Sequence, residues 1–186
     1  SDKFTHLLRY KNDALMVSYK TLNKDNSKLN CRIKGFSNYS PKRVILDNKL
    51  QTKINNYVMK TANKDNTIIF YNQADKSKVV DFKKRKVQLI KSRVNKQGKF
   101  DIKSILKKLY FYNCRNLLIE GGDILTSHLL KKKLFNKFYL YKSPKILSKK
   151  IDYLKFNSLD ILKKNYKNKF NLNLLLGKDK ITLYKK

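Results

Sequence analysis

The chain has 186 residues, 41% of them hydrophobic, which suits one domain with a real core. No apolar run reaches the roughly 18 residues of a membrane-spanning helix, and the start lacks a signal-peptide pattern, so we expect a soluble, cytoplasmic protein without a membrane partner. The net charge of +32 is nearly all lysine spread along the chain, with only six arginines. Since guanidinium is the better reader of phosphate and guanine, codon bias explains this charge better than nucleic-acid binding does.

Five short, often β-branched apolar runs predict strands buried on both faces. They cover residues 14–17, 44–46, 67–71, 87–90 and 117–119. Asp101 is placed to cap a helix with apolar residues at helical spacing over 102–109, and a second helix fits 124–130. Runs at 138–141, 170–174 and 181–184 predict antiparallel strands that finish the sheet without strong helices between them. The pattern indicates an α/β fold with a mixed sheet.

The rare residues of this lysine-rich chain are informative. Glu120 is the only glutamate, and it precedes Gly121 and Gly122, two of only five glycines. A strand, a double glycine and a helix let a phosphate or ribose approach the backbone, although an ordinary tight connection shows the same pattern. A carboxylate at the carboxyl end of a central strand favours ligand binding, because open α/β sheets bind ligands there.

A second group of polar residues lies near the start of the chain. Arg9 precedes a loop that runs from Thr21 to Arg32, and the segment 41–48 predicts a strand that ends in Asp-Asn. Two arginines around a loop with a hydroxyl and a carboxylate can bind an anionic substrate and a cofactor. A solvated loop would show the same residues, so each piece is weak by itself.

The two cysteines, Cys31 and Cys114, are far apart in sequence and match no metal-ligand spacing. We therefore expect free thiols and no metal site. The sequence also offers no convincing pair of nucleophile and base. His6 is expected on a helix surface, and His128 is at most a contact near a cofactor phosphate.

Together and in order, these segments resemble the C-terminal reductase domain of the bifunctional riboflavin-biosynthesis deaminase-reductase. That family shows an Asp-Ala strand, a Thr-to-Arg loop, a Pro-x-Arg strand ending in Asp, and a Glu-Gly-Gly turn before a helix. Here these elements are residues 13–17, 21–32, 41–47 and 118–122, and residues 142–147 resemble a later Pro-Lys segment. The resemblance covers about residues 7 to 147.

The resemblance implies a three-layer dihydrofolate-reductase-like fold with a mixed, mainly parallel central sheet. It implies NADPH as the cofactor and 5-amino-6-(5-phosphoribosylamino)uracil as the substrate, with hydride transfer to the ribosyl C1′. The implied substrate contacts are Arg9, Leu29, Arg32 and Glu120. The implied cofactor contacts are Thr21, Asp25, Asn48, Gly122, Asp123, Ile124, Leu125, Thr126, Ser127 and His128.

The chain also departs from the family pattern. The family's first strand has no counterpart before Ser1, so we expect weak or no activity in isolation, and normal steady-state turnover would contradict this. Residues 18–20 stand where many members carry glycine. The zinc-deaminase motifs are absent, so this chain is not expected to deaminate, and a deaminase domain is expected upstream in the native protein.

The resemblance favours a homodimer. A related reductase acting on another uracil or pterin would show the same motifs. The alternative from another class is a basic, non-enzymatic module that stacks its tyrosines on single-stranded nucleic acid.

Overall fold

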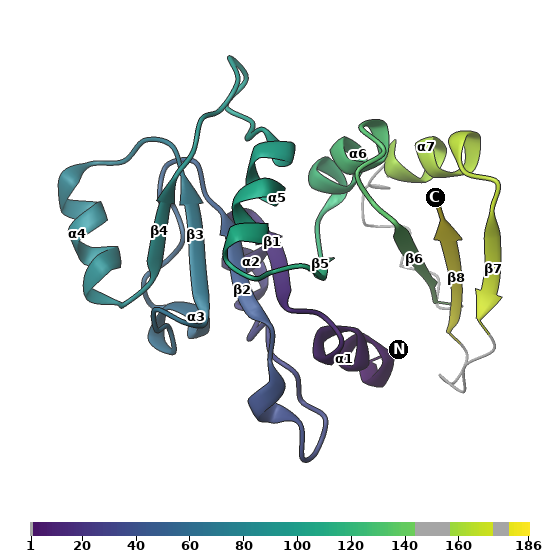
Figure 1. Cartoon of the computed structure of the whole chain (residues 1–186), viewed down its shortest axis with the longest axis horizontal. Helices are drawn as coiled ribbons and strands as arrows, with labels where there is room; N and C mark the ends of the chain where they lie inside the picture. The colour runs from purple at the N-terminus through teal and green to yellow at the C-terminus, as the bar shows by residue number, and fades with distance from the viewer. Residues whose placement is uncertain (1, 144–156, 173–178) are drawn as a thin grey trace, which may run out of the picture. The chain divides into compact units, whose positions relative to one another are not determined.

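A computed structural model describes residues 2–143, 157–172 and 179–186 (Figure 1). Its backbone divides into two compact units. One unit is Thr5–Gly121, and the other combines Ser1–Phe4 with Gly122–Lys186. The resemblance segment 142–147 lies outside the described residues from Pro144 onward, as does the end of the strand expected at 170–174.

The unit Thr5–Gly121 is built on a five-stranded sheet in the order β4-β3-β2-β1-β5. All four neighbouring pairs are parallel. The strands are β1 (Ala14–Ser18), β2 (Lys42–Leu46), β3 (Thr67–Tyr71), β4 (Gln88–Lys91) and β5 (Leu117–Ile119). These are the five strands expected from the sequence. However, β5 lies at the edge of this sheet, whereas the sequence analysis placed it at the centre. A short apolar run fits either position, so the sequence did not distinguish them. The three residues of β5 are half-buried.

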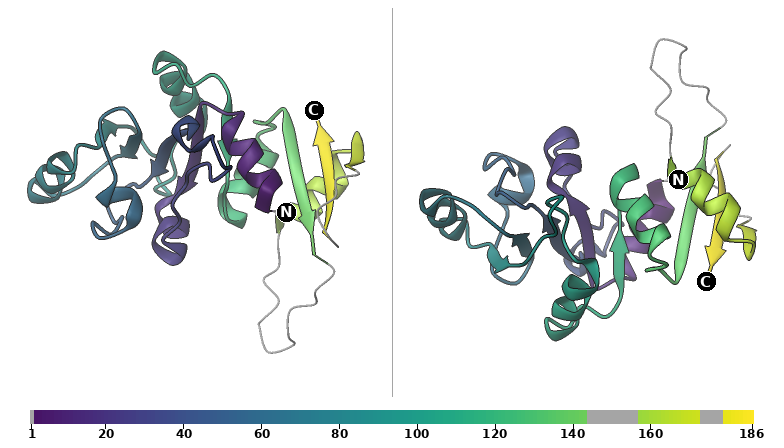
Figure 2. Two further views of the ribbon diagram at one scale, coloured as in Figure 1. Left: turned by 90° about the horizontal axis from the view of Figure 1, so that it is seen from below. Right: turned by 90° about the horizontal axis from the view of Figure 1, so that it is seen from above.

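Helices precede and connect these strands. They are α1 (Asp2–Tyr10), α2 (Tyr19–Asp25), the 3-10 helix Ser37–Tyr39, α3 (Tyr57–Lys60), α4 (Lys76–Lys84) and α5 (Ile102–Phe111). The predicted cap of α5 is confirmed, since the side chain of Asp101 accepts a hydrogen bond from Lys103 N at 3.1 Å. Figure 2 shows α2 and α5 on opposite faces of the parallel sheet.

The core of this unit has two faces because side chains alternate along each strand. Leu15, Ile45 and Ile69 belong to a cluster that also holds Leu22 of α2 and Phe82 of α4. Their strand neighbours Met16, Val44 and Ile68, all at most 1% exposed, point to the other face, which α5 covers (Figure 2). Burial on both faces explains why these strands read as continuous apolar runs.

The other unit carries an antiparallel sheet in the order β6-β8-β7. Its elements are α6 (Asp123–Lys131), β6 (Lys137–Lys142), α7 (Asn157–Asn165), β7 (Lys169–Leu172) and β8 (Lys180–Lys185). The antiparallel strands are confirmed, but they form a sheet of their own. The expectation that no strong helix separates them was wrong, because α7 buries Leu162 against Leu130, Tyr166 and Tyr184. Its apolar residues were too few among lysines and asparagines to predict a helix.

Candidate functional site

The candidate site begins at the carboxyl edge of the parallel sheet. The register pairs Ser18 with Leu46 and Met16 with Ile119, so the segments that follow β1, β2 and β5 leave the sheet on the same edge. Ligands of open α/β sheets bind at this edge. Thr21, Asn48 and Glu120 follow these three strands.

An ion pair joins the end of α1 to the end of β5. Arg9 Nε donates to Glu120 Oε1 at 2.8 Å, and Arg9 Nη2 donates to Glu120 Oε2 at 2.7 Å. The two side chains are 12% and 28% exposed, so the pair is largely shielded from water. Arg9 Nη1 also donates to Asn30 O at 3.1 Å, and Glu120 N donates to Met16 O at 3.1 Å. This bidentate, charge-assisted arrangement fixes both side chains at the sheet edge.

Arg32, in the segment that follows α2, lies beside His6 of α1. The backbone N of Arg32 lies 3.2 Å from His6 Nδ1, and Arg32 Nε lies 3.0 Å from His6 Nε2. A neutral imidazole has one acceptor nitrogen, so the ring accepts from only one of these groups at a time. The structure therefore brings both arginines of the sequence prediction to α1.

The expected surface position of His6 was wrong, because the residue is only 4% exposed. His6 and Arg9 are one turn apart on α1 and share the face that the segment 30–32 covers. That three-residue spacing is the sequence signal that would have found His6.

The side chain of Leu29, a predicted substrate contact, is buried in the core and cannot touch a ligand. Its side chain is 2% exposed and packs in the core cluster with Leu22 and Ile45. Its φ of +52° lies in the left-handed region, which disfavours branched side chains, so burial must hold it there. Only the backbone of Leu29 can be presented to a ligand, and its predicted substrate contact stays a prediction in that form.

Two buried side-chain oxygens, Asn30 Oδ1 and Asn48 Oδ1, have no hydrogen-bond partner among the described residues. Buried polar atoms are normally paired, so these two are places where a bound ligand can supply a donor. Asn30 Oδ1 belongs to the residue that contacts Arg9, and Asn48 follows β2. Asn30 was missed by the sequence analysis, because one asparagine carries no signal in an asparagine-rich chain.

The three predicted cofactor residues of this unit lie around the ends of β1 and β2. Thr21 is in the first turn of α2, with its hydroxyl 3.1 Å from Ser18 Oγ. Asp25 is exposed at the last residue of α2. The Asn48 side-chain Nδ2 donates to Gly98 O at 3.2 Å. In this orientation the side-chain Oδ1 of Asn48 has no hydrogen-bond partner among the described residues. A polar ligand with donors fits this arrangement.

Arg43 and Asp47, the charged residues of the Pro-x-Arg-to-Asp segment, hold the neighbouring loops in place. The carboxylate of Asp47 is fully buried and accepts from Gln51 N at 2.8 Å and from Thr52 N at 2.7 Å. Arg43 donates to Thr61 and Asn66, and burial lowers the pKa of its guanidinium to about 10. These residues shape the loops after β2 and leave Asn48 as the ligand candidate.

The glycine turn lies at the start of the other unit. A Cβ at Gly122 would meet nothing within 4 Å, and its φ is −70°, so the chain itself does not require glycine there. Gly122 is the N-cap of α6 and supplies no side-chain cap, and a helix N-terminus is a common place for an anion to bind.

Two predicted cofactor side chains on α6 are occupied within their own unit. Asp123 Oδ1 accepts from Ser158 N at 3.0 Å, from Ser158 Oγ at 2.6 Å and from Ser127 Oγ at 3.3 Å. Asp123 and Ser127 therefore tie α6 to α7. Ile124 is 69% exposed, whereas Leu125, Thr126 and His128 are half-buried on the same helix.

No cluster of three His, Cys, Asp or Glu side chains suited to a metal ion occurs among residues 2–143, 157–172 and 179–186. In the same ranges, no helix combines the length and apolar character that crossing a membrane requires. Cys31 and Cys114 are both buried free thiols.

The fold and site define an α/β domain with charged and polar side chains at the carboxyl edge of a parallel sheet. Residues 1–166 match the RibD C-terminal domain family, and the chain belongs to that family. It is 29% identical over 147 residues to the riboflavin biosynthesis protein RibD of Aquifex aeolicus, covering 79% of this chain and 39% of that relative. It is 31% identical over 150 residues to the 5-amino-6-(5-phosphoribosylamino)uracil reductase of Buchnera aphidicola, covering 75% and 69%.

Solved structures agree with the fold. Acinetobacter baumannii RibD aligns with a TM-score of 0.75 at 17% identity, over 99% of this chain and 49% of that chain. The deaminase/5-amino-6-(5-phosphoribosylamino)uracil reductase of Thermotoga maritima aligns with a TM-score of 0.70 at 24% identity, over 98% and 47%. The dihydrofolate-reductase-like α/β fold expected from the sequence is confirmed. The chain thus spans about half the length of these two proteins.

Proposed function

We propose that this chain transfers hydride from NADPH to C1′ of the ring-opened ribosyl group of 5-amino-6-(5-phosphoribosylamino)uracil. The C1′–O bond of the ribose ring breaks to leave a C1′=N imine, C1′ receives the hydride, the nitrogen takes one proton from solvent, and the ribitylamino product and NADP+ result. The observation that carries the proposal is the Arg9–Glu120 pair at the ligand-binding edge of the sheet, with Arg32 held against His6, one turn from Arg9 on α1. Membership of the family and the likeness to the Buchnera reductase support the same reaction.

The substrate groups would be divided among three side chains. The exposed guanidinium of Arg32 suits the substrate phosphate. Each oxygen of Glu120 accepts one bond from Arg9, and a carboxylate has about four acceptor sites, so Glu120 can also accept from a ribosyl hydroxyl or an amino group. Asn30 Oδ1 supplies one more acceptor. Arg9 acts by positioning Glu120.

The nicotinamide of NADPH would supply the hydride, so the chain needs no nucleophile of its own. Thr21, Asp25 and Asn48 are proposed to hold the cofactor, and Asn48 Oδ1 offers it an unpaired acceptor. The cofactor contacts that the sequence predicts on Gly122 and α6, in the other unit, stay predictions. What the chain contributes is alignment of the donor and acceptor carbons and exclusion of water.

Equilibrium titration with the substrate and with NADPH tests these roles. We expect Arg32→Gln to weaken substrate binding about tenfold, the loss of one charge-assisted contact, and to leave NADPH binding unchanged. Arg85→Gln removes the same charge from an exposed arginine at the end of α4 and serves as the control. Substrate that fails to bind the wild-type protein, or that binds both variants equally, would contradict the proposal.

Two comparisons separate the alternatives. A panel of phosphorylated uracils and pterins distinguishes this substrate from that of a related reductase. Salt-sensitive binding of oligonucleotide without any stabilisation by NADPH would favour the basic nucleic-acid module. The homodimer and the upstream deaminase domain stay predictions.

A further inference from the structure

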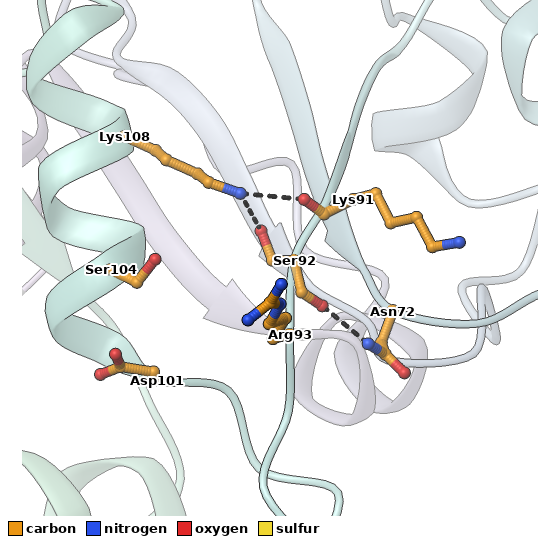
Figure 3. Close-up of a pocket in the computed structure, with 7 residues that line it drawn as sticks. All are labelled: Asn72, Lys91, Ser92, Arg93, Asp101, Ser104 and Lys108. Atoms are coloured by element: carbon orange, nitrogen blue, oxygen red, sulfur yellow. Dashed lines mark hydrogen bonds between the residues drawn. The ribbon is translucent and has the colours of Figure 1, made fainter.

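A pocket of about 600 Å³ opens on the same sheet edge, at the end of the sheet opposite to β5. Asn72 follows β3, Ser92 and Arg93 follow β4, and α5 supplies Ser104 and Lys108 (Figure 3). The pocket is therefore built where a parallel sheet binds ligands.

The pocket offers several hydrogen-bond donors. Lys108 Nζ donates to Lys91 O and to Ser92 Oγ, each at 2.9 Å, which holds the ammonium group in place with a third donor left over (Figure 3). Ser92 is 6% exposed and accepts from Lys108, so its hydroxyl proton is available to a ligand. Such an anchored ammonium beside a hydroxyl suits an anion.

Arg93 adds the strongest donor. Its exposed guanidinium makes no hydrogen bond or ion pair with any residue in the described part of the chain, and Figure 3 shows it between β4 and α5. The one carboxylate lining the pocket is Asp101, whose Oδ1 already caps α5 by accepting from Lys103 N. The lining holds three cationic residues, Lys91, Arg93 and Lys108, against this one occupied carboxylate, which favours an anion over a metal ion. A guanidinium, an ammonium and a hydroxyl together match a phosphate monoester.

The pocket is connected to the proposed cofactor site. Asn72 N donates to Asn48 O at 3.0 Å, and the Asn72 amide donates to Ser92 O at 3.0 Å. Asn48, a proposed NADPH contact, is thus hydrogen-bonded directly to Asn72, a residue that lines the pocket. Four strand spacings of about 4.8 Å separate β4 from β5, roughly 19 Å in all. The small uracil substrate would not reach from Glu120 to this pocket, whereas an extended dinucleotide would.

We infer that the pocket of Ser92, Arg93 and Lys108 binds the 2′-phosphate on the adenosine of NADPH and so distinguishes NADPH from NADH. The inference rests on the proposed function, because it requires the dinucleotide to lie along this sheet edge. Its chemistry is that of a phosphate monoester, which free phosphate shares in part.

The test is calorimetric titration of the wild-type protein and of Arg93→Gln with NADPH, NADH and inorganic phosphate. Arg93 has no partner in the described chain, so thermal unfolding of the variant should match that of the wild type. We expect Arg93→Gln to weaken NADPH binding about tenfold and to leave NADH binding unchanged. Arg85→Gln, with the same change of charge, should leave both affinities unchanged.

The outcomes of these titrations distinguish failure of the 2′-phosphate assignment from failure of the proposed function. Equal weakening of NADPH and NADH, or no change in either, overturns the 2′-phosphate assignment while NADPH binding by the wild type keeps the proposed function intact. Binding of inorganic phosphate by a wild-type protein that does not distinguish NADPH from NADH assigns the pocket to free phosphate and also overturns the inference. Failure of the wild type to bind either dinucleotide overturns both proposals.

Discussion

Removing the partner of Arg9 is the perturbation that the structure defines best. Glu120→Gln keeps the shape of the side chain but removes the charge that accepts two hydrogen bonds, at 2.8 and 2.7 Å. The Arg9 guanidinium, whose side chain is 12% exposed, is then left without its carboxylate. Arg9→Gln is the reciprocal change, and the double variant removes both charges.

The loss of unfolding free energy expected for Glu120→Gln lies between the values for an exposed and for a fully buried ion pair. An exposed ion pair contributes up to about 1 kcal/mol, and removing one partner of a fully buried pair costs about 3 to 5 kcal/mol. With exposures of 12% and 28%, we expect Glu120→Gln to lower the free energy of unfolding by about 1 to 2 kcal/mol. For a chain of this length, that lowers Tm by roughly 2 to 8 °C.

A double-mutant cycle measured by urea denaturation isolates the pair. The double variant should lose about 1 kcal/mol less than the sum of the two single variants. Arg9→Gln combined with Asp81→Asn, an exposed carboxylate on α4, should be additive and is the control. Additivity for Arg9 and Glu120 within about 0.5 kcal/mol would refute the pair.

Three further predictions concern the framework around the site. Leu29→Ala should cost about 2 to 4 kcal/mol in urea denaturation, since it empties a core position; a loss below about 0.5 kcal/mol would place this side chain at the surface. Asp47→Ala should cost about 3 kcal/mol or more by the same measurement, because Gln51 N and Thr52 N lose their buried acceptor, and a neutral outcome would contradict that network. Burial raises the pKa of the Cys114 thiol, so alkylation of the native protein should be slow at neutral pH and accelerate as pH rises; labelling as fast as in urea would disprove the burial.

The sequence predicted the parallel sheet well for a physical reason. Strands buried on both faces must be apolar throughout, and β1 to β5 carry that signal in a chain otherwise filled with lysine and asparagine. It could not predict the edge position of β5, because strand order depends on contacts between distant segments. Helix α7 was missed since its burial depends on partners such as Leu130 and Tyr184.

The candidate site was predicted unevenly. Arg9, Arg32 and Glu120 carried a signal because arginine and glutamate are rare in this composition, and the structure brings the first two to α1 and pairs Arg9 with Glu120. The burial of His6 was not predicted, although its three-residue spacing from Arg9 was a signal for it. The role of Asn30 was not predicted, because it follows from the approach of the segment 30–32 to α1. The side chains of Asp123 and Ser127 proved to be engaged with α7, a contact no local pattern encodes.

Isotope transfer in a single turnover tests the central claim most directly. The protein, in excess over substrate, is mixed with 5-amino-6-(5-phosphoribosylamino)uracil and NADPH that carries deuterium at the transferable position. Because the protein is in excess, all of the substrate can be bound, and deuterium transfer is detected even when it is slow. The account predicts a ribitylamino product with one deuterium at C1′; substrate and NADPH that both bind without any transfer of deuterium to C1′ would contradict it.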